Sequence, residues 1–121
     1  MRRLYILRQL ALAAAILSSE LSAVSIKTIP VGTTPIYLAV NQMTNRVYVS
    51  NLLSHTVSVI DGATNTVAAT VPVGTDPSFI DVDANTNMVY VSNINSVSVI
   101  DGHNNTVVTT ITDVSSHLAL R

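Results

Sequence analysis

The residues best suited to metal binding form one polar run, residues 81–87, which contains two aspartates and two asparagines. Oxygen-bearing side chains at alternate positions are typical of a calcium-binding loop. Such a loop also needs a glycine at its sixth position and an acidic residue at its twelfth, where this chain has Thr86 and Ser92. We therefore predict that this run is a polar turn between two strands and not a metal site.

The three histidines are not expected to act together. His55 and His103 fall in loops that a β-meander places at opposite ends of its strands, and His117 lies in the C-terminal tail. The chain has no cysteine, which excludes disulfides and thiolate metal sites, and its one glutamate is Glu20. Ser-His-Asp catalysis needs three groups in one geometry, which the predicted elements do not supply. We expect no catalytic, cofactor-binding or metal-binding residue and no enzyme activity.

An internal repeat organises the chain that must position these residues. Residues 47–51 read Val-Tyr-Val-Ser-Asn, and residues 89–93 repeat them letter for letter. A Pro-Val-Gly segment precedes each copy, and Val-Ser-Val-Ile-Asp-Gly follows each one, at residues 57–62 and 97–102. A repeat of 40 to 42 residues with several short strands is characteristic of a propeller blade.

Each repeat is predicted to be a four-stranded antiparallel meander. In the first repeat the strands are expected at four short segments rich in β-branched residues, joined by polar turns: residues 36–40, 46–50, 56–60 and 66–71. Gly62 is expected to supply a positive φ, and Asp61 to cap its own backbone. Pro72 has no N–H to donate and ends the fourth strand. The two units are residues 36–71 and 78–111.

The faces of the strands distinguish between β architectures. Val47 and Val49 share one face of their strand, Tyr48 and Ser50 share the other, and neither face is charged. A sandwich sheet with one solvated face would alternate apolar with charged residues. A propeller blade is covered on both faces by its neighbours. The sequence therefore predicts an all-β fold of antiparallel four-stranded propeller blades.

The repeat resembles the YVTN family of β-propeller repeats. The Tyr-Val-x-Asn motif of that family stands here as residues 48–51 and 90–93, with Ser at the third position where the family name has Thr. The Pro-Val-Gly-x-x-Pro entry and the Val-Ser-Val-Ile-Asp strand also match, so the resemblance covers residues 26–111. It implies an exported or cell-surface protein that uses its propeller as a binding or scaffolding platform. Some propellers of similar appearance are lactonases or lyases, and that alternative requires catalytic residues on further blades.

The predicted propeller is incomplete. Two blades are present, and residues 25–29 are expected to be an orphan fourth strand of another blade, whereas closure takes about four to eight blades. Each uncovered blade face exposes about 5 large apolar side chains, worth ~1.5–3 kcal/mol apiece when buried. We expect further blades of a longer propeller to cover these faces, with self-association of several copies as the alternative.

The loops at one end of the blades are the expected binding surface. These loops are residues 32–35, 51–55, 74–77 and 93–96, which are polar and nearly uncharged. Such a surface suits a protein or a glycan, and the mildly acidic body of the chain argues against nucleic acid. No two of the polar residues there are expected to lie where they tune one another's pKa: Thr33, Thr34, Ser54, His55, Thr75, Asp76 and Asn95.

Residues 1–23 have the organisation of a secretory signal. Three arginines lie in the first eight residues, and an apolar run follows at residues 10–17. This run is too short for a stable membrane span, which needs about 20 residues. We expect cleavage after Ala23 and an exported product, periplasmic, secreted or on the cell surface, with the propeller repeats in residues 24–121. The alternative is an N-terminal helix of the mature protein.

Overall fold

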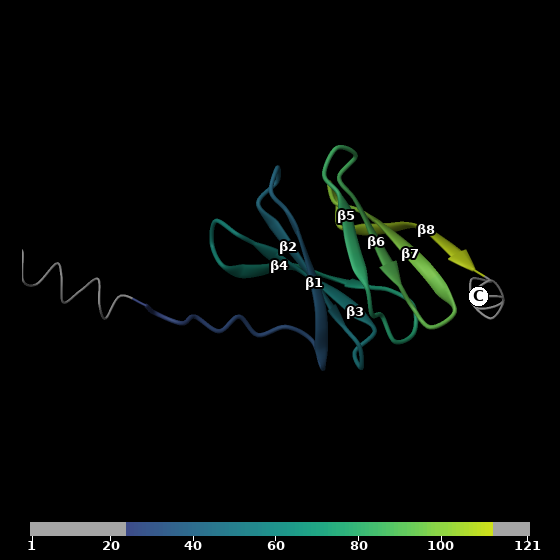
Figure 1. The fold of residues 1–121 in the computed structure, drawn as a ribbon, viewed down its shortest axis with the longest axis horizontal. Coiled ribbons are helices and arrows are strands. Elements are labelled where there is room, and N and C mark those ends of the chain that lie inside the picture. The colour runs from purple at the N-terminus through teal and green to yellow at the C-terminus, as the bar shows by residue number, and fades with distance from the viewer. Residues whose placement is uncertain (1–23, 113–121) are drawn as a thin grey trace, which may run out of the picture.

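The computed structural model describes residues 24–112, so the predicted signal segment and His117 lie outside the described residues. The first sheet consists of β1 (Pro35–Asn41), β2 (Arg46–Asn51), β3 (Thr56–Asp61) and β4 (Thr66–Pro72). The second sheet consists of β5 (Ile80–Asp83), β6 (Met88–Ser92), β7 (Ser96–Asp101) and β8 (Thr106–Thr112). Each is an antiparallel meander whose strands neighbour one another in chain order (Figure 1). The prediction of an all-β fold with two four-stranded antiparallel sheets is confirmed. Within residues 24–112 no helix is long and apolar enough to cross a membrane.

The two sheets pack through unlike faces. Tyr48 pairs with Val59 in the ladder of the first sheet, and residues directly opposed in an antiparallel ladder share a face. We call this side of the first sheet the tyrosine face; its buried members are Tyr48, Ser50, Val57, Val59 and Val71. The second sheet meets it with a valine face formed by Val89, Val91 and Ile100, together with Ile80, Val82 and Val107. These two faces form the hydrophobic core between the sheets.

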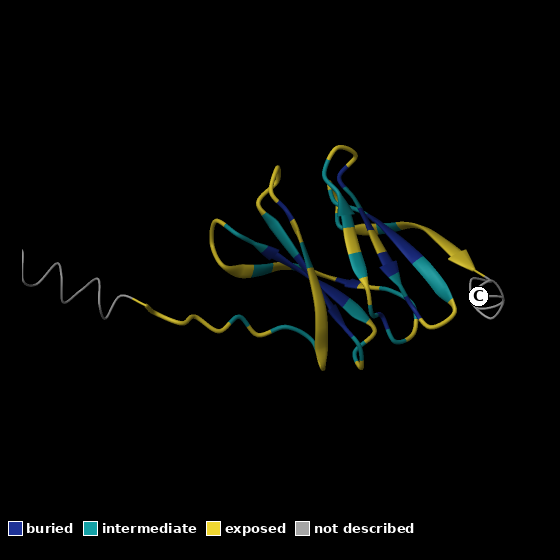
Figure 2. Cartoon of the chain, in the orientation of Figure 1, coloured by how far each residue is buried: buried dark blue, intermediate teal, exposed yellow. Residues whose placement is uncertain are grey.

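The inner strands carry most of the burial. Figure 2 shows the buried residues concentrated on β2, β3, β6 and β7, while β8 is largely exposed. The sheets contact each other mainly through β1 and β5, as Figure 1 shows. The identical motifs therefore have different environments: Tyr48 is 0% exposed between the sheets, whereas Tyr90 is 42% exposed on the outer side of the second sheet.

Three polar and aromatic contacts supplement the core between the sheets. The side-chain amide of Asn41 donates to Oδ1 of Asn87 at 2.9 Å, and both residues are buried. Ser50 Oγ donates to the backbone oxygen of Ser78 at 2.6 Å. The rings of Tyr37 and Phe79, which occupy the same position in successive repeats, lie with centroids 4.5 Å apart. Such a tilted ring pair adds about 0.5–1.5 kcal/mol to the burial of the rings.

Asparagines in the αL region make the turns between strands, and this corrects one prediction. Asp61 accepts a hydrogen bond from the N–H of Ala63 at 2.8 Å, as expected for a turn that caps its own backbone. Gly62, however, does not have a positive φ; Asn65 has it, with φ 54°. Glycine is required at position 62 because there is no space for a side chain: a Cβ at Gly62 would lie 2.2 Å from Oδ1 of Asn45.

The prediction of an orphan strand at residues 25–29 is wrong for the described structure. These residues have no regular secondary structure, and Figure 1 shows their segment extending away from both sheets. A strand is stabilised by its ladder hydrogen bonds, and none of the strands in residues 35–112 lies there to provide them. Ile26 is accordingly 90% exposed.

Candidate functional site

Loops at one end of the two sheets form the candidate site, and we call them the loop end: residues 32–35, 51–55, 74–77 and 93–96. Backbone hydrogen bonds join neighbouring loops. The N–H groups of Leu52 and Leu53 donate to the carbonyls of Thr34 and Thr33, at 2.9 and 3.2 Å. The N–H of Ile94 donates to Thr75 in the same way at 2.9 Å. These bonds join the two loops of each repeat, and a bond from the N–H of Asp76 to His55 links the loops of one repeat to those of the other.

Strained backbone is concentrated in these loops. Within residues 24–112, seven residues other than glycine have a positive φ, and four of them are asparagines in hairpin turns. The other three, Thr34, His55 and Asp76, all lie in the loop end, with φ between 51° and 55°. A β-branched residue such as Thr34 rarely adopts this conformation, and strain of this kind is often found at functional sites.

His55 connects two loops of the loop end. Its Nδ1 accepts a hydrogen bond from the backbone N–H of Asp76 at 3.0 Å and lies 3.6 Å from the Asp76 carboxylate. A ring nitrogen that accepts a hydrogen bond carries no proton, so this bond selects the neutral tautomer protonated on Nε2. In that state the short contact with the carboxylate is not an ion pair. His55 holds the connection between β4 and β5 in place.

The structure brings two titratable side chains of the loop end, His55 and Asp76, close together. The loop after β2 and the connection after β4 meet because β3 runs back between them, which brings His55 beside Asp76. The hydrogen bonds of the other predicted residues of the loop end join neighbouring loops of one repeat. Thr33 donates its backbone N–H to Ser54 Oγ at 3.1 Å, and Thr75 and Asn95 are exposed.

Two exposed aliphatic side chains also belong to the loop end, and sequence reasoning missed them. Leu53 is 59% exposed and Ile94 is 56% exposed, one in the loop between the two central strands of each sheet. The loop end also contains hydroxyl and amide side chains: Thr33, Thr34, Ser54, Thr75 and Asn95. The sequence offered one signal that these two residues belong to the loop end: each follows shortly after the repeated asparagine, Asn51 or Asn93, which is buried.

The calcium-like run is a turn, as predicted. Asp83 ends β5 and accepts a hydrogen bond from the N–H of Asn85 at 3.0 Å, and Asn87 has a φ of 57°. Asp81 accepts from the N–H of its own neighbour Val82. Among residues 24–112 no three His, Asp, Glu or Cys side chains gather where they could hold a metal ion.

His103 and Asp101 lie in a turn at the opposite end of the sheets from His55. The backbone N–H of His103 donates to Asp101 Oδ1 at 2.8 Å, and the His103 ring nitrogen lies 3.0 Å from the same oxygen. These bonds, the backbone bond first, lower the pKa of the Asp101 carboxyl below its ordinary value. The pair stabilises its own turn and has no contact with the loop end.

Solved structures show what kind of β-protein this is. Hydrazine synthase of Kuenenia stuttgartiensis matches 64% of this chain with 29% sequence identity and a TM-score of 0.61. Apo AztD of Citrobacter koseri matches 73% of it with 19% identity and a TM-score of 0.63. Both matched proteins are propeller-like. The two sheets are β-propeller blades.

These blades are a small part of the matched proteins, since the chain spans 23% of the hydrazine synthase chain and 26% of AztD. No protein-family model and no curated protein matches the sequence. In a propeller the loops at one end of every blade lie on the same face of the ring. The loop end of this chain is therefore an arc of such a face.

Replacing His55 by alanine should loosen this arc. Loss of one hydrogen bond is expected to lower the free energy of unfolding by about 1 kcal/mol. It should also speed amide hydrogen exchange at Asp76, whose N–H loses its acceptor. His103→Ala is the matched control, because the His103 side chain is 72% exposed at the opposite end. Unchanged protection of the Asp76 amide in His55→Ala would contradict this role.

Proposed function

We propose that this chain is an exported or cell-surface repeat module of the YVTN type whose loop end binds a protein partner. The observation that carries the proposal is the pair of exposed side chains Leu53 and Ile94, set among polar groups on hydrogen-bonded loops. Protein interfaces combine an apolar centre with a polar rim. A backbone already fixed by cross-loop bonds also loses less conformational entropy on binding.

The chemistry of the loop end favours a protein over other ligands. It contains one carboxylate, Asp76, and no Lys or Arg, which does not suit a phosphate backbone. Glycan-binding surfaces commonly stack a sugar ring on an aromatic side chain, and the loop end has no Phe, Tyr or Trp. Aliphatic side chains with hydroxyl neighbours match the side chains and backbone of a peptide better.

Selection from a random peptide display library, followed by titration of the selected peptides, tests this proposal. The double variant Leu53→Ser/Ile94→Ser should weaken binding roughly tenfold or more, because it removes the two exposed aliphatic side chains of the loop end. Met43→Ser is the control, since Met43 is 73% exposed in a turn at the opposite end. Peptides that bind equally well to the double variant would overturn the proposal, and binding confined to a glycan panel would assign a glycan ligand instead.

The competing function is that of a propeller enzyme, lactonase- or lyase-like, whose catalytic residues lie on further blades. His55 and Asp76 are the only titratable pair of the loop end, and the N–H of Asp76 occupies His55 Nδ1. We therefore expect no turnover of lactone or lyase substrates by this chain. Turnover that His55→Ala abolishes would establish the enzyme instead.

N-terminal sequencing tests export: the exported product should begin near Val24, and one that begins at Met1 would contradict a cleaved signal.

A further inference from the structure

The interface between the sheets joins a tyrosine face to a valine face. Because the two sheets have the same sequence pattern, the outer side of each sheet carries the face that its inner side lacks. By register, Tyr90 faces outward beside Val99, as Tyr48 faces inward beside Val59. The second sheet thus has an outer tyrosine face: Tyr90, Ser92, Val97, Val99 and Ile111. The first sheet likewise has an outer valine face: Leu38, Val40, Val47, Val49, Ile60 and Val67.

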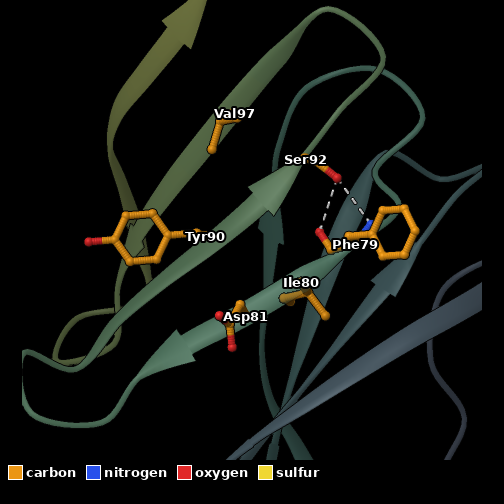
Figure 3. Close-up of a pocket in the computed structure, with 6 residues that line it drawn as sticks. All are labelled: Phe79, Ile80, Asp81, Tyr90, Ser92 and Val97. Carbon is orange, nitrogen blue, oxygen red and sulfur yellow. Dashed lines mark hydrogen bonds between the residues drawn. The ribbon is translucent and has the colours of Figure 1, made fainter. Parts of the chain in front are cut away.

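Among residues 24–112 both outer faces are apolar and partly exposed. On the outer tyrosine face, Tyr90 is 42% exposed and Phe79 61%, and they border a hollow of ≈ 370 Å³ with Ser92 and Val97 (Figure 3). On the outer valine face, Leu38 is 63% exposed and borders a second hollow, of ≈ 380 Å³. Exposed apolar areas of this kind mark interaction surfaces.

We propose that the outer tyrosine face of one copy of this chain binds the outer valine face of a second copy. The interface inside the chain is the template, because it joins the same two faces. Phe79 then stacks on Tyr37 of the next copy, as Tyr37 and Phe79 stack within the chain. Ser92 occupies the position of Ser50, so its hydroxyl can donate to the backbone carbonyl of Ile36 in the next copy, as Ser50 does to Ser78.

The two repeats differ at two positions that affect how tightly the copies bind. Asp81 stands at the position of Ala39, which stays partly exposed even when its face is covered, so the Asp81 carboxylate keeps access to water. Asp83 stands at the position of Asn41, which is 0% exposed. There Asn45 of the next copy must be the donor, because a carboxylate has no N–H. Burying the charge of Asp83 weakens the contact relative to the template.

Such an interface is heterologous, because it joins two different faces. It generates a ring if the rotation closes and a filament if it does not. Since a propeller closes with about four to eight blades, two to four copies supply a complete ring. This self-association uses residues away from the loop end. An experiment can therefore contradict self-association without contradicting the proposed peptide binding, and the reverse.

Mixing two blocked variants of the full chain tests the pairing by sedimentation velocity. Tyr90→Arg blocks the outer tyrosine face, and Leu38→Arg blocks the outer valine face; both positions are exposed, so folding is retained and is checked by circular dichroism. The wild type should form oligomers at micromolar concentration, and each variant alone should be monomeric. An equal mixture should form a one-to-one dimer, in which the two intact faces meet.

Other outcomes overturn the proposal. A wild type that stays monomeric shows that something other than a second copy covers these faces. A Leu38→Arg chain that still dimerises alone shows that like faces pair. A gain-of-binding variant removes any ambiguity from misfolding: Asp83→Asn restores the residue of the first repeat and should tighten self-association roughly tenfold. Unchanged or weaker association of Asp83→Asn would also contradict the pairing.

Discussion

Tyr48→Ala is expected to lower the free energy of unfolding by about 3–5 kcal/mol, the usual cost of removing a large buried aromatic side chain. Tyr48 is 0% exposed, and its ring packs between the two sheets in the hydrophobic core. No other side chain of residues 24–112 is expected to fill the cavity that this substitution leaves. Urea denaturation at a concentration where the chain is monomeric measures the change.

The repeat provides the matched control for this experiment. Tyr90→Ala removes the same side chain from the same position of the ladder, but Tyr90 is 42% exposed, so a monomer should lose less than about 1 kcal/mol. Tyr48→Phe distinguishes the contribution of the ring to stability from that of the hydroxyl. The hydroxyl is buried without a hydrogen-bond partner in the described structure. Burial raises the pKa of this hydroxyl, and its removal should be neutral or stabilising. Equal losses at Tyr48 and Tyr90 would contradict the packing described here.

Asn41→Leu is expected to lower the free energy of unfolding by about 2–4 kcal/mol. The substitution leaves Oδ1 of Asn87 buried without the donor it has now. It also removes the acceptor that the N–H groups of Met43 and Thr44 use in the turn after β1. An unpaired buried acceptor costs more than the hydrogen bond contributes, because water cannot replace the lost partner. Thermal or urea unfolding measures the loss.

Asp83→Leu is the control for Asn41→Leu, since Asp83 ends the first strand of the second sheet at the equivalent position. It accepts one turn hydrogen bond, from Asn85, and it is only partly buried. A monomer should lose less than about 1 kcal/mol with this change. If both leucine variants lost the same stability, the bond between Asn41 and Asn87 would not hold the sheets together.

Strand order and facing could be predicted from the sequence because they are local properties. The repeated segments and the polar turns between them place the strands of both sheets, and the two-residue period of a strand decides which side chains share a face. The Asx turn at Asp61 could be predicted too, because the carboxylate bonds its own backbone two residues on. The reason for Gly62 could not be predicted: the positive φ falls on Asn65, and the space beside Gly62 is taken by Asn45, which lies in another hairpin turn.

The candidate site was only partly predictable. The meander places His55 and Asp76 at the same end of the sheets, but only packing of the loops brings His55 Nδ1 to 3.0 Å from the N–H of Asp76. The exposure of Leu53 and Ile94 likewise depends on the loops that surround them, because an aliphatic residue in a sequence is more often buried.

The sequence by itself determined the strands, their register and the identity of the two faces of each sheet. Only the tertiary structure decided which of these faces is buried. Residues 47–51 and 89–93 are identical, yet Tyr48 is 0% exposed and Tyr90 is 42% exposed. The reason is that the direction of a side chain follows from its own backbone, whereas burial depends on what lies across the face. Tyr48 has the valine face of the second sheet opposite it, whereas no sheet of residues 24–112 lies opposite Tyr90.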